Sequence, residues 1–171
     1  MADVSIIYEI INDSAEAYRE VIPKDLWNEP YMSLTYLNSE IEAGVVFFGL
    51  TGGGGRLLGV MGIQDKKDVF LIRHAYVRTT SRRQGIGAQL LTHLTRNFDK
   101  PLLVGTWKAA HWAISFYEKY GFEDVGPAET ARMLKTYWSI SARQVETSIV
   151  LADGRWRNWH ETVQDHAKYI V

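Results

Sequence analysis

A basic, glycine-containing loop joins a predicted strand to an amphipathic helix in the middle of the sequence. Residues 69–77 follow a predicted hairpin turn at 65–68 and are expected to form a strand. Residues 85–98 predict a helix because their apolar side chains recur at helical spacing, at Ile86, Leu90, Leu91, Leu94 and Phe98. A second strand is predicted at residues 101–107. Strand, loop, helix and strand in this order form a parallel crossover unit, which is typical of an α/β fold.

The loop has the features of an anion site. It reads Arg-Arg-Gln-Gly-Ile-Gly from Arg82 to Gly87. The first N–H groups of a helix lack intrahelical acceptors and lie at the positive end of its dipole, so they can hold a pyrophosphate. Gly85 and Gly87 would let a phosphate approach the backbone. Two glycines in a tight turn beside solvated arginines are the structural alternative, whereas a dinucleotide fingerprint would need Gly or Ala at Leu90.

The other elements follow from periodicity and turn residues. Strands are expected at residues 4–10, 44–50, 57–63, 122–125 and 144–151, and helices at 15–21, 33–44, 109–120 and 129–138. Asn12, Asp13 or Ser14 would cap the helix at 15–21. The four glycines at 52–55 and the residues 65–68 are expected to form hairpin turns.

Charge and cysteine content exclude several classes of function. The net charge of −1 provides no basic field for nucleic acid or an anionic membrane, so neither is an expected partner. The absence of cysteine excludes disulfides, thiolate metal sites and an acyl-cysteine intermediate. The histidines outside the central strand have no metal-ligand spacing, so no metal is expected; they are His93, His111, His160 and His166.

Residues 1–10 lack a basic and apolar signal-peptide pattern, and no apolar stretch is long enough to span a membrane. We therefore expect a cytoplasmic protein, and the sequence leaves both a monomer and a homodimer open.

A second motif lies one crossover later and suggests a family. Residues 113–122 end in the pattern Tyr-x-x-x-Gly-Phe, which begins at Tyr117. Together with the Arg/Gln-x-x-Gly-x-Gly/Ala loop, this motif resembles the GNAT superfamily of N-acetyltransferases. The resemblance implies an α/β GNAT fold, a mixed central sheet of about seven strands with helices on both faces. Its fourth and fifth strands, 69–77 and 101–107, would splay apart. The domain would span 1–151, followed by a tail at 152–171.

The resemblance also implies acetyl-CoA as co-substrate and acetyl transfer to a primary amine in a ternary complex. The residues expected to line the pyrophosphate are Arg83, Gln84, Gly85, Ile86, Gly87 and Ala88, with Arg82 adding positive charge. The pantetheine arm would pair with the backbone of Ala75, Tyr76 and Val77. Two departures from the family pattern are visible: Ala110 stands where many relatives carry Asn, and no carboxylate lies near Gly105.

Three sets of side chains are candidates for the chemistry. Tyr117 matches the family's usual acid, which donates toward the departing sulfur, and core packing is its structural alternative. His74 is the candidate base because histidine titrates near neutrality and lies three residues before Val77. A structural hydrogen bond is its alternative. The acceptor pocket is expected to be lined by Trp27, Tyr31 and Trp107, and core packing is the alternative role of these residues.

Two other function classes stay open at this point. One is a module that binds acetyl-CoA, or a protein partner, without turnover. The other is an unrelated α/β interaction protein, which would not bind CoA.

Overall fold

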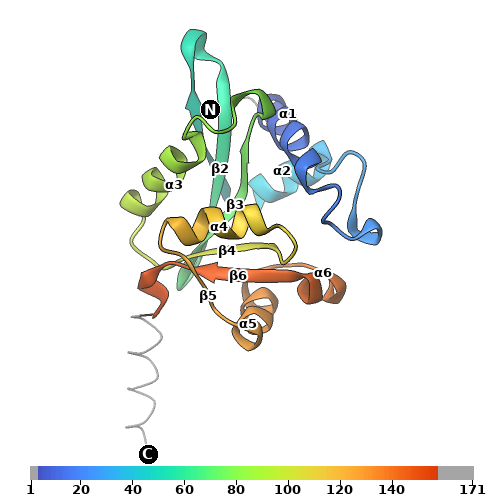
Figure 1. Ribbon diagram of the computed structural model, residues 1–171, viewed down its shortest axis with the longest axis vertical. Helices are drawn as coiled ribbons and strands as arrows, with labels where there is room; N and C mark the ends of the chain where they lie inside the picture. Colours follow the sequence, from blue (N-terminus) through green and yellow to red (C-terminus); the bar gives the residue numbers. More distant parts are fainter. Residues whose placement is uncertain (1–3, 158–171) are drawn as a thin grey trace, which may run out of the picture. The chain divides into compact units, whose positions relative to one another are not determined.

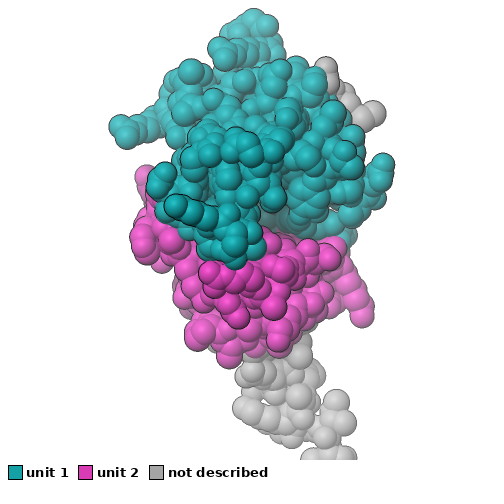
Figure 2. Space-filling model, turned by 90° about the vertical axis from the view of Figure 1, so that its right-hand side faces the viewer, with its two compact units in different colours: residues 1–65, 72–99 teal, residues 66–71, 100–171 magenta. Residues whose placement is uncertain are grey.

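The computed structural model describes residues 4–157. The chain forms two compact units, which are described separately (Figure 2): unit 1 comprises residues 1–65 and 72–99, and unit 2 comprises residues 66–71 and 100–171. The strands follow the order β1-β2-β3-β4-β6-β5. The predicted mixed α/β fold is confirmed, with one strand fewer than expected among the described residues.

Unit 1 packs helices against both faces of its strands. Its elements are α1 (Val4–Ala15), α2 (Leu34–Glu42), β1 (Val45–Thr51), β2 (Leu57–Lys66), the later part of β3 (Val69–Val77) and α3 (Ile86–Asn97). Figure 1 shows α1 and α2 on one side of the strands and α3 on the other. Neighbouring side chains of β1 reflect this arrangement. Phe47 packs into the cluster formed with α1 and α2, whereas the Phe48 ring lies 5.1 Å from the ring of His93 on α3.

The segments 44–50, 57–63 and 69–77 are confirmed as strands, and β1 and β2 form the predicted antiparallel hairpin. The predicted second helix is also confirmed. Ser33 caps α2 by accepting a hydrogen bond from the N–H of Tyr36 at 3.1 Å. Gly44 follows the helix with a φ of 94°, a conformation that glycine adopts readily.

The predicted strand at residues 4–10 and the helix at 15–21 are wrong. Residues 4–15 form the single helix α1, and only a short 3-10 turn, Glu16–Tyr18, follows. The buried side chains of α1 are spaced by three and four residues and form one helical face: Ile7, Ile10, Ile11, Ser14 and Ala15. Packing of this face outweighs the β-branched composition, and the missing strand accounts for the lower strand number.

Unit 2 is built around three strands that pair antiparallel, β4 with β6 and β5 with β6. Its elements are the start of β3, β4 (Leu102–Trp107), α4 (His111–Lys119), β5 (Glu123–Asp124), α5 (Pro127–Tyr137), α6 (Ala142–Thr147) and β6 (Ser148–Ala152). The N–H of Phe70 donates to the carbonyl of Pro101 at 2.9 Å. β3 and β4 therefore start side by side, as the predicted parallel crossover requires.

The C-terminal part of unit 2 differs from the prediction. The segment 144–151 was expected to be one strand, but α6 occupies its first part because Ser141 caps a helical turn by accepting the Gln144 N–H at 3.2 Å. β6 extends to Ala152, and Trp156 is buried in the same cluster as Val150 and Met133. Residues 158–171 of the predicted tail lie outside the described residues. None of the helices between residues 4 and 157 has the length and apolar character needed to cross a bilayer.

Candidate functional site

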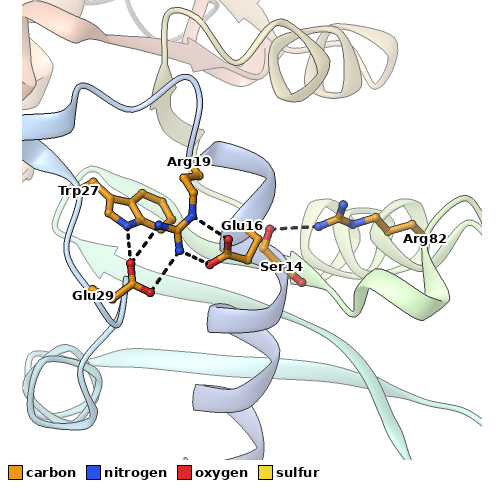
Figure 3. Close-up of polar contacts among 6 residues, drawn as sticks. All are labelled: Ser14, Glu16, Arg19, Trp27, Glu29 and Arg82. Carbon is orange, nitrogen blue, oxygen red and sulfur yellow. Dashed lines mark hydrogen bonds and ion pairs between the residues drawn. The ribbon is translucent and has the colours of Figure 1, made fainter.

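The end of α1 holds the glycine-containing loop in place. The Ser14 hydroxyl donates to the carbonyl of Val77 at 2.6 Å, and an Asp13 carboxylate oxygen accepts the N–H of Thr79 at 2.7 Å. Arg82 donates from Nη2 to the carbonyl of Ser14 at 3.0 Å (Figure 3). Asp13 and Ser14 were predicted to cap a helix that does not form. Instead, they anchor a loop more than sixty residues further along the chain.

The electrostatics of this anchor favour the ionised carboxylate. Slight burial raises the pKa of Asp13, but the hydrogen bond from Thr79 and the charges of Arg82 and Arg78 outweigh it, so the pKa lies below its ordinary value. Arg78 also donates to the carbonyl of Leu57 at 2.8 Å, which fixes the start of the loop to β2.

The backbone of the loop adopts left-handed conformations just before α3 begins. Arg83 and Gly85 both have positive φ values, 61° and 77°. A Cβ atom at Gly85 would meet no protein atom within 4 Å, so glycine is needed there for its conformation and not for packing. The N–H groups of Ile86, Gly87 and Ala88 belong to the first helical turn and lack intrahelical acceptors. This arrangement suits a diphosphate.

Apart from Tyr117, which lies in unit 2, the predicted cofactor residues lie between residues 75 and 88 of unit 1. Ala75, Tyr76 and Val77 end β3, and Arg82 to Gly85 are exposed. Both arginines are exposed, but Arg82 is bound to the Ser14 carbonyl. Ile86 is buried, so only its backbone can contribute to the anion site. A Cβ atom at Gly59 would lie 2.9 Å from Ile86 Cγ2, and glycine on β2 therefore allows α3 to start this close to the sheet.

Trp27 and Tyr31 contact each other and reach the predicted pantetheine strand. Their ring centroids are 5.3 Å apart, and the Tyr31 ring lies 6.4 Å from that of Tyr76. The guanidinium of Arg19 lies 4.7 Å from the Trp27 ring centroid, and Glu29 accepts the Trp27 indole N–H at 3.1 Å (Figure 3). The two residues thus form one aromatic patch beside β3, and the polar contacts of Arg19 and Glu29 hold its outer end.

His74 lies in a polar cluster that joins three elements of unit 1. Its backbone φ is 49°, which is unusual for a residue within a strand. Its Nε2 atom lies 2.8 Å from Oε2 of Glu40 on α2. Arg73 forms an ion pair with the same oxygen and donates to Gln64 on β2 at 2.9 Å. The ring of Phe47 stacks on the imidazole, with centroids 6.1 Å apart.

The ionisable groups of this cluster affect one another. Burial lowers the pKa of His74, the hydrogen bond to Glu40 raises it, and the charge of Arg73 lowers it; the result lies below its ordinary value. Burial raises the pKa of Glu40, but the His74 hydrogen bond and Arg73 bring it below its ordinary value. Partial burial and the Glu40 charge raise the pKa of Tyr36. At neutral pH the imidazole is therefore neutral and the carboxylate is charged.

Tyr117 lies in unit 2, where the second motif forms a helix end. Gly121 follows α4 with a φ of 82°, and the N–H of Phe122 donates to the Tyr117 carbonyl at 3.1 Å. The Tyr117 ring is 5% exposed and lies 5.5 Å from the ring of Phe122. The Tyr-x-x-x-Gly-Phe pattern therefore has a structural basis, in which glycine ends the helix and the two aromatic rings pack together.

Apolar groups lie at both positions where the sequence departs from the family pattern. Ala110 is completely buried just before α4. Beside Gly105, a Cβ atom would lie 3.4 Å from the indole of Trp138, so this ring occupies the space next to the strand. Trp107, the third predicted acceptor residue, ends β4 and is buried.

Sequence reasoning missed Glu40, Arg73 and Gly59, and it gave Ser14 a capping role in place of its contact with the loop. A glycine within an apolar strand is a recognised sign of close backbone approach, and it could have indicated Gly59. Local spacing carries no such signal for Glu40, because its partner His74 is 34 residues away in the sequence. Between residues 4 and 157, no cluster of three or more potential ligand side chains could hold a metal ion.

We expect Ser14→Ala to lower the free energy of unfolding by about 1–2 kcal/mol, because the buried hydroxyl is lost and the Val77 carbonyl loses its donor. Urea unfolding measures the change. Ser39→Ala is the matched control, because this exposed hydroxyl donates to the Tyr36 carbonyl within α2. Its expected cost is below about 0.5 kcal/mol. Equal losses in both variants would contradict the anchoring role.

Comparison with known proteins then identifies the family. The sequence profile described as the acetyltransferase (GNAT) domain matches residues 13–135. The chain belongs to this GNAT acetyltransferase family. The resemblance read from the two motifs is thereby confirmed, and acyl transfer is the class of reaction that membership supports. Among curated protein sequences, none is significantly similar to this chain.

Solved GNAT structures share the fold at low sequence identity. The PaiA N-acetyltransferase of Thermoplasma acidophilum, in complex with coenzyme A, is 16% identical, with 88% of this chain and 92% of that chain covered and a TM-score of 0.64. The ribosomal-protein-S18-alanine N-acetyltransferase of Escherichia coli is 20% identical, with coverage of 90% and 88% and a TM-score of 0.60. An Elizabethkingia anophelis GNAT acetyltransferase with acetyl-CoA bound is 22% identical, with coverage of 77% and 90% and a TM-score of 0.53.

Proposed function

We propose that this GNAT protein transfers an acetyl group from acetyl-CoA to a primary amine by direct attack within a ternary complex. The observation that carries the proposal is the left-handed glycine at the start of α3, Gly85, where a Cβ atom would meet no protein atom within 4 Å. The fold and coenzyme A ligand of the Thermoplasma acidophilum structure support this assignment of the loop. An acyl-cysteine route is excluded because the chain has no cysteine.

The loop and strand β3 bind different parts of acetyl-CoA. The backbone N–H groups of Ile86, Gly87 and Ala88 hold the diphosphate, with Arg83 and Gln84 at the exposed edge of the loop. The backbone of residues 75–77 pairs with the pantetheine arm as an added strand would. The N–H of Val77 polarises the thioester carbonyl, because a donor near the oxygen stabilises the negative charge that develops there.

Two side chains handle protons. The amine must lose a proton before its nitrogen can attack the carbonyl carbon, and His74 takes that proton as general base. The carbon–sulfur bond then breaks, and the phenol of Tyr117 donates a hydrogen bond to the departing sulfur. Tyr117 lies in unit 2, so its role rests on the motif and on its place at the end of α4. Trp27, Tyr31 and Trp107 are proposed to contact the acceptor amine.

Calorimetry with CoA and an assay of thiol release test this function together. The expected result is saturable CoA binding and thiol release from acetyl-CoA that depends on an added amine, in a panel that includes small amines, polyamines and peptides with a free N-terminal alanine. The last of these follows the substrate named for the Escherichia coli neighbour.

The competing function is a CoA-binding module without turnover. The apolar groups at Ala110 and beside Gly105 favour it, since the family pattern has Asn at the first position in many relatives and a carboxylate near the second in some. CoA binding without thiol release from any member of the panel would establish the module, and absence of CoA binding would exclude both functions.

A further inference from the structure

A strained histidine and a mostly shielded carboxylate are bonded to each other in unit 1. His74 holds a positive φ in the middle of β3, a conformation that costs a non-glycine residue on the order of 1 kcal/mol and persists only where the surroundings impose it. The side chains of Arg73, His74 and Glu40 are 13%, 12% and 12% exposed. Three polar groups are thus shielded from water and bonded to one another.

The contacts of one oxygen determine the proton arrangement. Glu40 Oε2 is bonded to Arg73, whose guanidinium can only donate hydrogen bonds. The same oxygen lies 2.8 Å from His74 Nε2. An ionised carboxylate only accepts, so Nε2 must carry the hydrogen of this bond. A neutral imidazole has one N–H, and its lone pair is therefore on Nδ1.

We propose that Glu40 is a positioning residue that holds His74 as the Nε2–H tautomer, so that Nδ1 is the atom that takes the proton from the acceptor amine. This inference rests on the proposed function, in which His74 is the base. The ammonium of the acceptor gives one proton to Nδ1, and the imidazolium that forms is stabilised by Glu40. The neutral amine uses its electron pair to bond to the carbonyl carbon. As the carbon–sulfur bond breaks, the second proton of the nitrogen passes to the thiolate, which leaves as the CoA thiol. The proton on Nδ1 leaves to solvent before the next turnover.

Arg73 limits how strongly Glu40 acts on the imidazole. Because the guanidinium shares the carboxylate oxygen, the negative charge of Glu40 is partly balanced before His74 is protonated. The other elements around the pair add little charge: β2 contributes the amide of Gln64, β1 the ring of Phe47, and α2 the neutral phenol of Tyr36. His74 thereby stays neutral near physiological pH and is ready to accept a proton.

Imidazole nitrogen-15 NMR of the whole protein reads the tautomer directly, with His74→Gln used to assign the signals. The expected wild-type result at neutral pH is a protonated Nε2 and an unprotonated Nδ1. In Glu40→Gln, the amide can donate or accept, so the preference for one tautomer is expected to weaken.

In the same Glu40→Gln variant, we expect kcat to fall about tenfold. The KM for acetyl-CoA should not change, and the acidic limb of the pH–rate profile should move to lower pH because the imidazolium loses its counter-charge.

Control variants separate this role from a structural one. Glu42→Gln removes the same charge from an exposed position of α2 and should change neither the NMR signals nor kcat. Glu40→Gln leaves Arg73 without its carboxylate, so thermal unfolding is measured alongside, and the double variant Glu40→Gln/Arg73→Gln avoids an uncompensated charge. Glu40→Asp keeps the acceptor and should recover part of the activity.

The outcomes distinguish the two levels of the proposal. A wild-type signal from the Nδ1–H tautomer, or a Glu40→Gln variant indistinguishable from Glu42→Gln, would overturn the role of Glu40 while leaving acetyl transfer intact. Retention of the acidic limb in His74→Gln would remove His74 as the base, and with it this inference. Failure of the proposed function would show separately, as absence of amine-dependent thiol release in the wild type.

Discussion

Tyr117→Phe is expected to lower kcat by one to two orders of magnitude, about 1.4 to 2.7 kcal/mol in transition-state stabilisation, with little change in CoA affinity. The substitution removes only the hydroxyl, and the ring keeps its packing against Phe116 and Phe122, with centroids 5.1 and 5.5 Å away. Because phenols are weaker acids than thiols by about 1.5 pKa units, a hydrogen bond to the sulfur accounts for more of this effect than complete proton transfer.

Tyr120→Phe provides the matched control for this prediction. Tyr120 ends the same helix and is 37% exposed, so loss of its hydroxyl should leave kcat unchanged. Initial rates and calorimetric CoA binding, measured on both variants, separate turnover from affinity. A Tyr117→Phe enzyme with wild-type turnover would remove Tyr117 from the acid role. A variant that loses CoA affinity to the same extent as turnover would assign it to binding.

Gly85→Ala is expected to weaken CoA binding by about 5- to 30-fold, because alanine lets the free loop relax out of the left-handed conformation and binding must restore it at a cost on the order of 1–2 kcal/mol. The new methyl group would meet no protein atom within 4 Å, so a clash within the fold does not contribute. It would instead lie at the mouth of the anion site, where the diphosphate is proposed to bind. Calorimetric titration with CoA gives the dissociation constant.

Gly54→Ala is a close control for the backbone strain alone. Gly54 has a φ of 71°, and a Cβ atom there would also meet nothing within 4 Å, but it lies in the hairpin between β1 and β2. Its substitution should lower stability to a similar extent and leave CoA affinity unchanged. Equal CoA affinities in the Gly85 and Gly54 variants would contradict the proposed position of the diphosphate.

The parts of the fold that were predicted well have strong local signals. The segment β3–loop–α3 combines a strand that follows a hairpin turn, two glycines and helical spacing, and α2 has a serine cap and a terminal glycine. α1 was mistaken for a strand because five of its residues are Val or Ile, whose β propensity is high. Burial of one helical face decided the outcome, and burial depends on partners that are distant in the sequence.

The same distinction applies to the candidate site. The anion loop is contiguous, so its residues could be found from one motif. The partner of His74 comes from α2, and the anchors of the loop come from α1. These contacts form only when the chain folds, and no spacing rule connects their members. His74 was selected as a base because histidine titrates near neutrality. Its tautomer, in contrast, is set by the carboxylate of Glu40, which is 34 residues away in the sequence.

The attachment of α1 to the anion loop makes the N-terminal helix part of the same equilibrium. Asp13 and Ser14 contact the loop through Thr79 and Val77, so any molecule that orders the loop also favours the folded last turn of α1. By reciprocity, fraying of that turn reduces the fraction of molecules whose loop has the conformation that binds the ligand. A ligand at the diphosphate position would therefore stabilise the last turn of α1 without contacting it.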